Sequence, residues 1–248
     1  MPTRALIINS NSNNLDCLGV FFTCMEKFVG SKFFSNVYLF IDPVDHPFPR
    51  YVEVVNYNPK DNFRDQMVSC LKRVSEDIIL YCNDDYLFYD NANLELAEKL
   101  IDEIVGTKFS FVKFVHTNLE AYTEHKPKLL IIDKDCENTF SQTLSFWKTK
   151  DFLEIHENCP PSEIGSKGET FGHLEVFAKQ VSKELGIAGL CYYNNEKQRG
   201  QCHFDSDIFP HIASALVKGK WNLKEYSKEL FPLLLTHQIN LGERGLFQ

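Results

Sequence analysis

Short, mostly apolar runs alternate with helix-periodic segments in the first part of the chain. Several runs have the length and apolar continuity of strands buried on both faces: residues 5–9, 37–42, 51–55 and 78–82. Between them, residues 15–29 and 62–74 carry apolar side chains at helical spacing. Strands that alternate with helices are typical of a doubly wound, largely parallel α/β sheet with crossover connections.

The rest of the chain continues this alternation and adds strands that we expect to be antiparallel. Apolar stripes predict further helices over residues 94–105, 171–185 and 221–236. Apolar or alternating runs predict strands over residues 109–115, 129–133, 139–146 and 191–193. The polar stretch 116–128 is expected to be a loop. We therefore expect one Rossmann-like α/β domain over residues 1–220, with a mixed, mostly parallel sheet, and a C-terminal helix and tail over residues 221–248 packed on it.

Charge and cysteine usage narrow the classes of function. The 26 basic and 34 acidic residues give a net charge of -8, which argues against binding a nucleic-acid backbone as the main activity. No apolar stretch reaches the roughly 18 residues that a membrane span needs. The eight cysteines form no Cys-x-x-Cys pair and several lie in apolar runs, as expected of buried thiols in a reducing compartment. Because no signal peptide precedes the first strand, we expect a cytoplasmic protein.

The most chemically specific segment follows the run 78–82, where apolar residues give way to Asn83, Asp84 and Asp85. Ligands of open α/β sheets bind beyond the carboxyl ends of the strands, so these side chains are placed to reach a substrate. Mg²⁺ and Mn²⁺ prefer oxygen ligands and reach phosphates through one or two carboxylates. The acidic pair therefore predicts a site for a divalent cation and a nucleotide diphosphate, and a polar turn after a strand is the competing interpretation.

Taken together, these segments resemble a known enzyme family. The strand end Asn9-Ser10-Asn11, the run 37–42, and a helix leading into residues 79–86 are similar to the GT-A-fold, nucleotide-sugar-dependent glycosyltransferases. The resemblance covers roughly residues 4–205. It implies a nucleotide diphosphate sugar as donor, a saccharide or other hydroxyl acceptor, and Mn²⁺ or Mg²⁺ as cofactor. Asn83-Asp84-Asp85 stands at the family's DXD position, and because an amide comes first, which two side chains reach the metal stays open.

Position in the predicted sheet also assigns donor contacts. Asn9 and Asn11 stand at the end of the first strand, and Asp42 stands at the end of the second. Arg64 or Gln66 lies on the helix that leads to the acidic strand. We expect these side chains to hold base, ribose and phosphate, and each of them also suits a helix cap or a surface position.

Two glutamates compete for the role of general base, which an inverting transfer requires. Glu169 forms an S-x-x-E capping box with Ser166, which gives it a structural role at the helix start. Glu175 flanks the apolar stripe, where partial burial raises the pKa of a carboxylate toward the value that a base needs. Leu174-Glu175 also resembles the end of the family's acceptor-side motif. Glu175 is predicted as the base, Glu169 is the alternative, and a retaining enzyme would need neither.

The resemblance implies further site residues. A histidine late in the chain often supplies a third metal ligand in the family, and His203 is the candidate, with Asp205 as the oxygen alternative. An ordinary surface histidine is the competing interpretation of His203. The resemblance also places Gln142, Ser145 and Trp147 beside the acceptor, although a core position suits a lone tryptophan equally well.

The sequence thus predicts a metal-dependent glycosyltransferase and leaves two alternatives open. Sugar-phosphate nucleotidyltransferases share such a sheet, but they generally carry a glycine-rich loop where this chain has Asn-Ser-Asn-Ser-Asn-Asn over residues 9–14. A catalytically silent saccharide-binding protein on the same fold is the other alternative. Near the C-terminus, Arg244 suits either a mobile cation that closes over the diphosphate or part of a frayed end.

Overall fold

The apolar runs form strands whose alternate side chains face two separate cores. The computed structural model describes residues 2–115, 122–133, 140–161, 171–199, 203–204 and 206–247, with the backbone alone for 171–173 and 203–204. In the first strand, Leu6 and Ile8 belong to one core, while Ala5 and Ile7 belong to the other. Burial on both faces is the reason that these runs are continuously apolar rather than alternating.

The central sheet has the strand order β3-β2-β1-β4-β9-β6-β10-β8-β7. The bounds of its strands, in chain order, are β1 Arg4–Asn9, β2 Asn36–Ile41, β3 Val52–Asn56, β4 Ile78–Asn83, β6 Phe109–Lys113, β7 Tyr122–Lys126, β8 Leu129–Ile132, β9 Ser145–Lys148 and β10 Ala188–Tyr192. Strands β9 and β8 run antiparallel to their neighbours, whereas the other strands point in one direction. The mixed, mostly parallel α/β sheet expected from the sequence is therefore confirmed.

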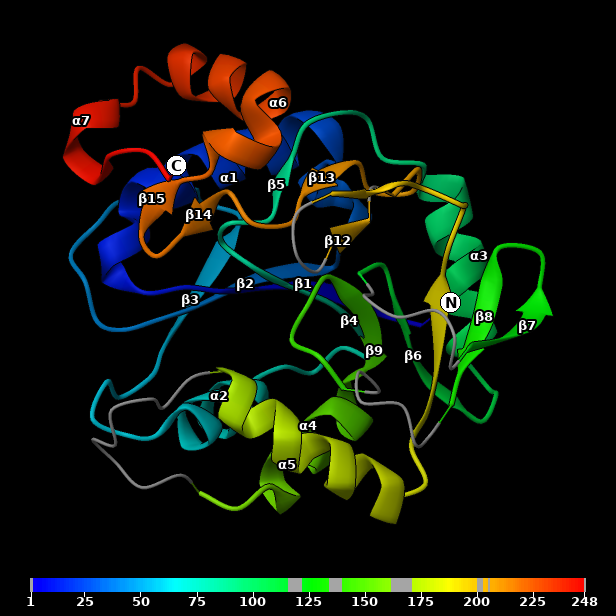
Figure 1. Ribbon diagram of the computed structural model, residues 1–248. Helices are drawn as coiled ribbons and strands as arrows, with labels where there is room; N and C mark the ends of the chain where they lie inside the picture. The colour runs from blue at the N-terminus through cyan, green and yellow to red at the C-terminus, as the bar shows by residue number, and fades with distance from the viewer. Residues whose placement is uncertain are drawn as a thin grey trace.

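Helices cover both faces of the sheet. Their bounds are α1 Leu15–Phe28, α2 Phe63–Leu71, α3 Leu94–Ile104, α4 Thr149–Asn158, α5 Phe171–Glu184, α6 Leu223–Thr236 and α7 Leu241–Arg244, with short 3₁₀ turns at Ser12–Asn14 (η1) and Ser31–Phe33 (η2). Figure 1 shows α2, α4 and α5 gathered on one side of the sheet and α1, α6 and α7 on the other. Helices α1, α3 and α6 contribute to one core, and α2, α4 and α5 contribute to the other.

Besides the central sheet, the described part of the chain has three short pairs of antiparallel strands. Strand β5 (Leu87–Phe88) pairs with β13 (His211–Ile212), β11 (Gln198–Arg199) with β12 (His203–Phe204), and β14 (Leu216–Val217) with β15 (Lys220–Trp221). The β14–β15 hairpin is tied to the acidic segment, because the amide of Ala215 donates to the carbonyl oxygen of Asp85 at 3.0 Å. The chain after residue 205 thus returns to the end of β4.

Some sequence expectations were wrong in detail. Within the predicted loop 116–128, residues 122–126 form the strand β7, whose mostly exposed, polar side chains hide it from a hydrophobicity pattern. The strand predicted over 139–146 is displaced: β9 begins at Ser145, inserts between β4 and β6, and leads directly into α4, which the sequence analysis did not predict.

The C-terminal segment packs on the main body of the protein. Trp221, Tyr226, Leu230 and Leu234 are buried in the same core as the residues of β1. The division into a domain over residues 1–220 and a C-terminal helix and tail over residues 221–248 stays a prediction. Among the described residues, no helix combines the length and the apolar character that a bilayer span requires.

Close packing between β10 and β6 yields a test of the sheet register. Gly189 lies opposite Phe111, and a Cβ atom at position 189 would lie 1.9 Å from Cζ of that ring. The ring is held in place by stacking on Trp147, with 4.1 Å between ring centroids. We predict that Gly189→Ala lowers the free energy of unfolding by about 1–3 kcal/mol, measured by urea denaturation, because neither ring has room to move.

The matched control is Gly19→Ala, in the exposed part of α1. A Cβ there meets no atom within 4 Å, and alanine is favoured over glycine in helices by about 1 kcal/mol, so this variant should be as stable as the wild type or more stable. Equal effects of the two substitutions would contradict the packing described for β10.

Candidate active site

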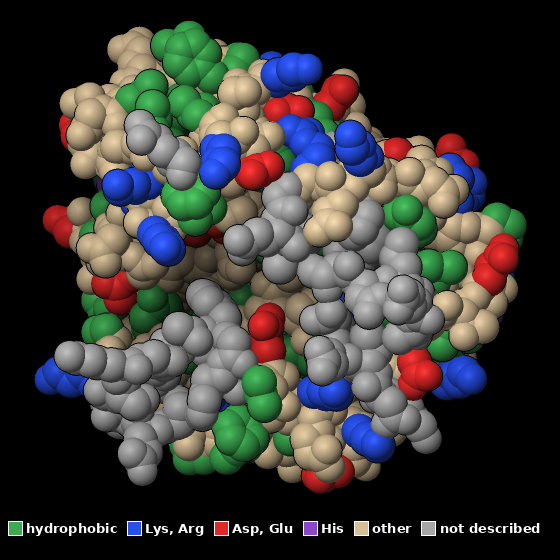
Figure 2. Space-filling view, viewed as in Figure 1, with side chains coloured by type: hydrophobic (Ala, Val, Ile, Leu, Met, Phe, Trp, Pro, Cys, Tyr) green, Lys and Arg blue, Asp and Glu red, His purple; other side chains and the backbone are tan. Residues whose placement is uncertain are grey.

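A cavity of about 570 Å³ opens where the parallel strands β1 and β4 end. Asn9 and Asn83 are neighbours in the register of these strands, and the acidic segment follows directly. Figure 2 shows that this face of the molecule is hollowed between the part that carries α6 and α7 and the part that carries α2, α4 and α5. The lining residues are Asn9, Ser10, Asn11, Asn14, Tyr57, Phe63, Gln66, Asn83, Asp84, Asp85, Tyr86, Ala213, Ser214, Leu216 and Gly219.

The two adjacent carboxylates lie inside this cavity. Asp84 is buried, and its Oδ2 accepts a hydrogen bond of 2.5 Å from Ser10 Oγ. Its backbone amide donates to the carbonyl oxygen of Asn9 at 3.2 Å, which fixes the turn after β4. Asp85 is half-buried, and hydrogen bonds from Ser214 and from the backbone of Leu216 reach its carboxylate. The β14–β15 hairpin therefore forms the wall of the cavity beside Asp85.

Burial and mutual repulsion make this pair costly to ionise. Burial raises the pKa of Asp84, and burial together with the charge of Asp84 raises the pKa of Asp85. Arg244 lowers the pKa of Asp84 through its charge, but its own ion pair is with Asp16. A buried and a half-buried carboxylate that line one cavity and are held by neutral donors are a donor set that fits a divalent cation with oxygen ligands.

The first residue of the motif, Asn83, lines the cavity but has its amide hydrogen-bonded within the protein. Asn83 Oδ1 accepts from the Tyr81 hydroxyl at 3.2 Å, and Asn83 Nδ2 donates to the carbonyl oxygen of Gln142 at 3.2 Å. Both ends of the amide are therefore engaged by the protein. This arrangement favours Asp84 and Asp85 as the two metal-facing side chains of the Asn-Asp-Asp segment.

The predicted donor contacts fall into two groups. Asn9, Asn11 and Gln66 line the cavity together with the acidic pair. Asp42 instead accepts from the backbone amide and the hydroxyl of Ser12, both at 2.6 Å, and so braces the loop after β1. Arg64 is directed to α4: its Nε donates to the carbonyl oxygen of Cys159 at 3.0 Å. The structure thus brings Asn9, Asn11 and Gln66 to the acidic pair and leaves Arg64 outside the cavity lining.

Glu175 lies on α5 and is connected to the cavity lining through Gln142, which also bonds to Asn83. Its Oε1 accepts from the backbone amide of Gln142 at 2.8 Å, and burial raises the pKa of its carboxyl group. Burial, followed by the negative charges of Asp85 and Glu175, raises the pKa of the Tyr86 hydroxyl. Tyr86 lines the cavity, so the acidic pair and Glu175 act on one cavity-lining residue from different elements.

A buried network that the sequence analysis did not assign holds Glu175 and Asn83. Burial lowers the pKa of His156 to about 4, so the ring is neutral near pH 7. Its Nδ1 donates to the carbonyl oxygen of Phe152 at 2.7 Å, which leaves Nε2 to accept from the side-chain amide of Gln142 at 3.1 Å. Gln142 Oε1 lies 3.1 Å from the Tyr81 hydroxyl, whose single proton is shared between Gln142 and Asn83 as acceptors.

Gln142 is therefore a buried hub rather than a surface group. Its side chain is 3% exposed, and its backbone contacts both Glu175 and Asn83. Trp147 is buried and stacked on Phe111, and its indole donates to Ser145 Oγ at 2.9 Å, so these two residues belong to the core. Within this network, only the contact between His156 and Phe152 follows from sequence spacing, because the two residues are four apart on α4. The contact between His156 and Gln142 joins residues 14 positions apart and leaves no such pattern.

The structure does not describe the side chains of three site residues that the sequence predicts. Glu169 and Asp205 lie outside the described residues, and His203 is described by its backbone alone, in β12 opposite Arg199. Within the described ranges, no group of three or more histidine, cysteine, aspartate or glutamate side chains surrounds a possible metal position. Asp84 and Asp85 are thus the described part of the predicted metal site.

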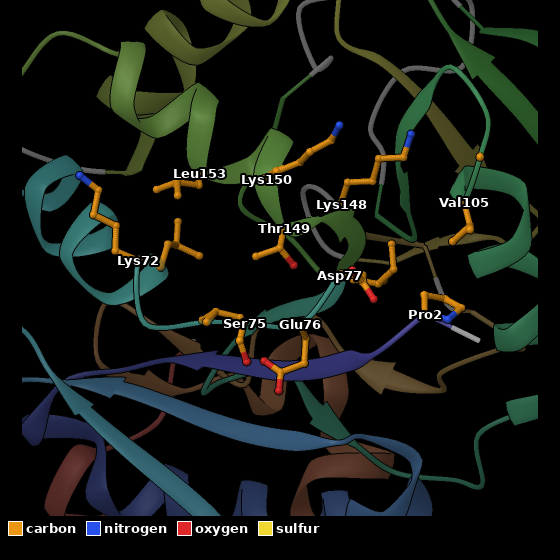
Figure 3. A pocket seen from close by; sticks show the side chains of 14 residues that line it. Pro2, Lys72, Ser75, Glu76, Asp77, Val105, Lys148, Thr149, Lys150 and Leu153 are labelled. Atoms are coloured by element: carbon orange, nitrogen blue, oxygen red, sulfur yellow. The ribbon is translucent and has the colours of Figure 1, made fainter.

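A larger cavity, about 920 Å³, opens at the opposite edge of the sheet, where β4 begins (Figure 3). In this view the ammonium group of Lys72 lies apart from those of Lys148 and Lys150. Lys72 is paired with Glu157 at 2.9 Å, and Lys148 donates to the carbonyl oxygen of Thr107 at 2.8 Å. The described residues that line this cavity include none of the predicted site residues, so the smaller cavity is the better candidate for chemistry.

Comparisons with known proteins support the fold. No protein-family model matches the sequence, and a search of curated proteins gives no match. Residues 1–349 of TarS from S. aureus share 10% identity, with a TM-score of 0.52 over 98% of this chain and 68% of that chain. The same fragment in complex with UDP-GlcNAc gives 11% identity and a TM-score of 0.50, over 99% of this chain and 68% of that chain. GalNAc-T7 with UDP, GalNAc and Mn²⁺ gives 9% identity and a TM-score of 0.53, over 77% of this chain and 42% of that chain.

The raised pKa values of the acidic pair predict a pH dependence of stability in the absence of metal. Unfolded aspartate ionises near pH 4. As pH rises above that value, the unfolded state loses its protons first, so the folded state loses stability until Asp84 and Asp85 have also ionised. In EDTA, Asp85→Asn should therefore become increasingly more stable than the wild type between pH 5 and pH 8, measured by chemical denaturation.

Asp77→Asn is the control of opposite sign, at the other end of β4. Hydrogen bonds from Thr3 lower the pKa of Asp77, so this carboxylate stabilises the fold above pH 4 and its removal is destabilising near neutrality. A pH-independent difference between Asp85→Asn and the wild type would show that Asp85 is not buried beside a second charge.

Proposed function

We propose that the protein is a metal-dependent glycosyltransferase that moves a sugar from a nucleotide diphosphate sugar to a hydroxyl acceptor. The observation that carries the proposal is the cavity at the ends of β1 and β4, which is lined by Asp84 and Asp85. Glu175 is connected to this lining through Gln142, whose amide donates to Glu175 and whose carbonyl oxygen accepts from Asn83. The similar structures support this choice of substrate, because TarS was determined with UDP-GlcNAc and GalNAc-T7 with UDP, GalNAc and Mn²⁺.

In this proposal Asp84 and Asp85 hold the cation, with His203 as the candidate third ligand. Mn²⁺ or Mg²⁺ bound there would neutralise charge on the diphosphate leaving group. Ser10 and Asn14 orient Asp84 by hydrogen bonds, while Ser214 orients Asp85. Asn9, Asn11 and Gln66 line the cavity and are proposed to contact the nucleotide.

Glu175 is proposed as the general base of an inverting transfer. The amide of Gln142 holds one carboxylate oxygen, and burial raises the pKa of the group, which favours uptake of a proton from the acceptor hydroxyl. The hydrogen bond from Gln142 and then the charge of Lys113 oppose this rise in the pKa of Glu175. The proton thus passes from the acceptor oxygen to Glu175 while that oxygen bonds to the sugar carbon, and the bond from the same carbon to the diphosphate breaks to release the nucleotide diphosphate.

The metal role is tested by thermal shift with UDP and UDP-sugars, with and without Mn²⁺. Ligands that bind the native state alone raise its melting temperature by mass action. Asp85→Asn should abolish the Mn²⁺-dependent part of the shift and keep the fold, because Asp85 follows the strand and lies outside the core. Asp77→Asn, in the wall of the larger cavity, should retain the whole shift. An unchanged Mn²⁺-dependent shift in Asp85→Asn would remove the basis of the proposal.

The base is tested by Glu175→Gln. The substituted amide keeps the shape of the carboxylate, and its carbonyl oxygen can still accept from Gln142, but it cannot take up the acceptor proton. Turnover should fall on the order of 10²-fold or more, with donor binding nearly unchanged. Release of UDP from the donor by water serves as the first assay, and NMR of the transferred sugar then reports its configuration.

Glu169→Gln is the comparison variant, expected to reduce stability by roughly 1 kcal/mol or less through the helix cap. Retention of configuration, or full activity in Glu175→Gln beside an inactive Glu169→Gln, would show that Glu175 is not the base. Pyrophosphate as the product would identify a nucleotidyltransferase instead. Nucleotide binding without any turnover would identify a silent binding protein.

A further inference from the structure

The C-terminal tail is fixed against the site rather than free to move. Asn240 caps α7 by accepting from the amide of Gly242 at 3.0 Å. The tail then pairs with β15: the Trp221 amide donates to the carbonyl oxygen of Gly245 at 3.1 Å, and the Phe247 amide donates to that of Trp221 at 2.9 Å. Both sequence interpretations of Arg244, a mobile cation and a frayed end, are therefore wrong for the structure described.

The guanidinium of Arg244 bridges two segments of the chain. It forms an ion pair with Asp16, with Nε donating to Oδ2 at 2.6 Å. Its Nη2 donates to the carbonyl oxygen of Asn13 at 2.6 Å and to Asn14 Oδ1 at 3.2 Å. Its Nη1 reaches the carbonyl oxygen of Gly219, at the tip of the β14–β15 hairpin, at 3.4 Å.

Both bridged segments are walls of the cavity. Asn14 and Gly219 line it, and the hairpin that carries Gly219 also supplies the partners of Asp85. A hydrogen bond from the Asn14 side chain reaches Asp84. Because Arg244 binds the oxygen of the Asn14 amide, it turns the amide nitrogen, the donor end, toward Asp84.

We infer that Arg244 is a positioning residue, which holds the Asn14 amide on Asp84 and fixes the hairpin beside Asp85 through its planar fork of donors. The inference rests on the proposed function, in which Asp84 and Asp85 hold the cation. Charge and positioning predict different results. The positive charge of Arg244 repels a bound cation. If charge were its whole effect, removing that charge would tighten Mn²⁺ binding, and replacing Arg244 by lysine would leave the binding unchanged. Positioning predicts weaker binding in Arg244→Lys, because lysine cannot reproduce the fork.

The experiment measures Mn²⁺ binding in the presence of UDP by EPR, which reports free and bound Mn²⁺ separately. Arg244→Lys should weaken binding by about tenfold, a loss of roughly 1.4 kcal/mol. Asn14→Ala, which leaves the tail intact, should also weaken it. The double variant should bind more weakly than Asn14→Ala by a smaller factor than Arg244→Lys alone weakens the wild type, because only the contact to the hairpin is then left to lose. Such non-additivity is expected where one residue acts through the other.

Arg4→Lys is the matched control at the opposite end of β1. Arg4 forms an ion pair with Glu98, donates to the carbonyl oxygen of Phe33 at 2.5 Å and lies over the Phe33 ring, as Arg244 lies over Trp221. This control should lose stability in EDTA to a similar degree but bind Mn²⁺ like the wild type. If the wild type binds Mn²⁺ and the Arg244→Lys and Arg4→Lys variants bind it with equal affinity, the inference about Arg244 is overturned and the proposed function is not. A wild type that binds no Mn²⁺ with UDP would overturn the proposed function together with it.

Discussion

The site is organised around two adjacent carboxylates at the end of β4, of which Asp84 is buried and Asp85 is half-buried. Burial and repulsion raise the pKa of both groups, so ionising the pair is unfavourable unless nearby groups compensate. The compensation comes from neutral donors: Ser10 after β1, Asn14 before α1, and the β14–β15 hairpin. Segments from the beginning and from the end of the chain must therefore both lie beside the end of β4. The β14–β15 hairpin and the C-terminal tail bring the end of the chain there. A divalent cation would supply the positive charge that these donors lack.

A second set of contacts holds the single carboxylate of Glu175, whose pKa is raised by burial. A neutral, fully buried His156 fixes the side chain of Gln142, and the backbone of Gln142 fixes Glu175 and Asn83. The same residue, Gln142, thus bonds to the amide of Asn83 and to the candidate base. Because its groups bond to one another inside the core, a change at His156 is expected to reach Glu175 without any contact to a ligand.

Continuous apolar runs made the parallel half of the sheet predictable, since burial on both faces leaves a plain signal in β1, β2 and β4. The polar edge strand β7 leaves no such signal, and β9 is short and set by its neighbours β4 and β6. At the site, strand ends located Asp84 and Asp85 together with Asn9. The roles of Gln142, His156 and Arg244 depend on contacts between segments far apart in sequence, which periodicity does not report. Arg64 shows the opposite case. Its position on the helix before the acidic strand predicted a donor contact, but its side chain bonds to the carbonyl oxygen of Cys159 at the end of α4.

The most direct test of the central claim is a crystal structure with UDP and Mn²⁺, with the metal located by anomalous scattering at the manganese edge. The account predicts one anomalous peak within about 2–2.3 Å of carboxylate oxygens of Asp84 and Asp85, in the cavity at the ends of β1 and β4. A peak in the larger cavity at the opposite edge of the sheet, or nucleotide bound with no metal at the acidic pair, would contradict it.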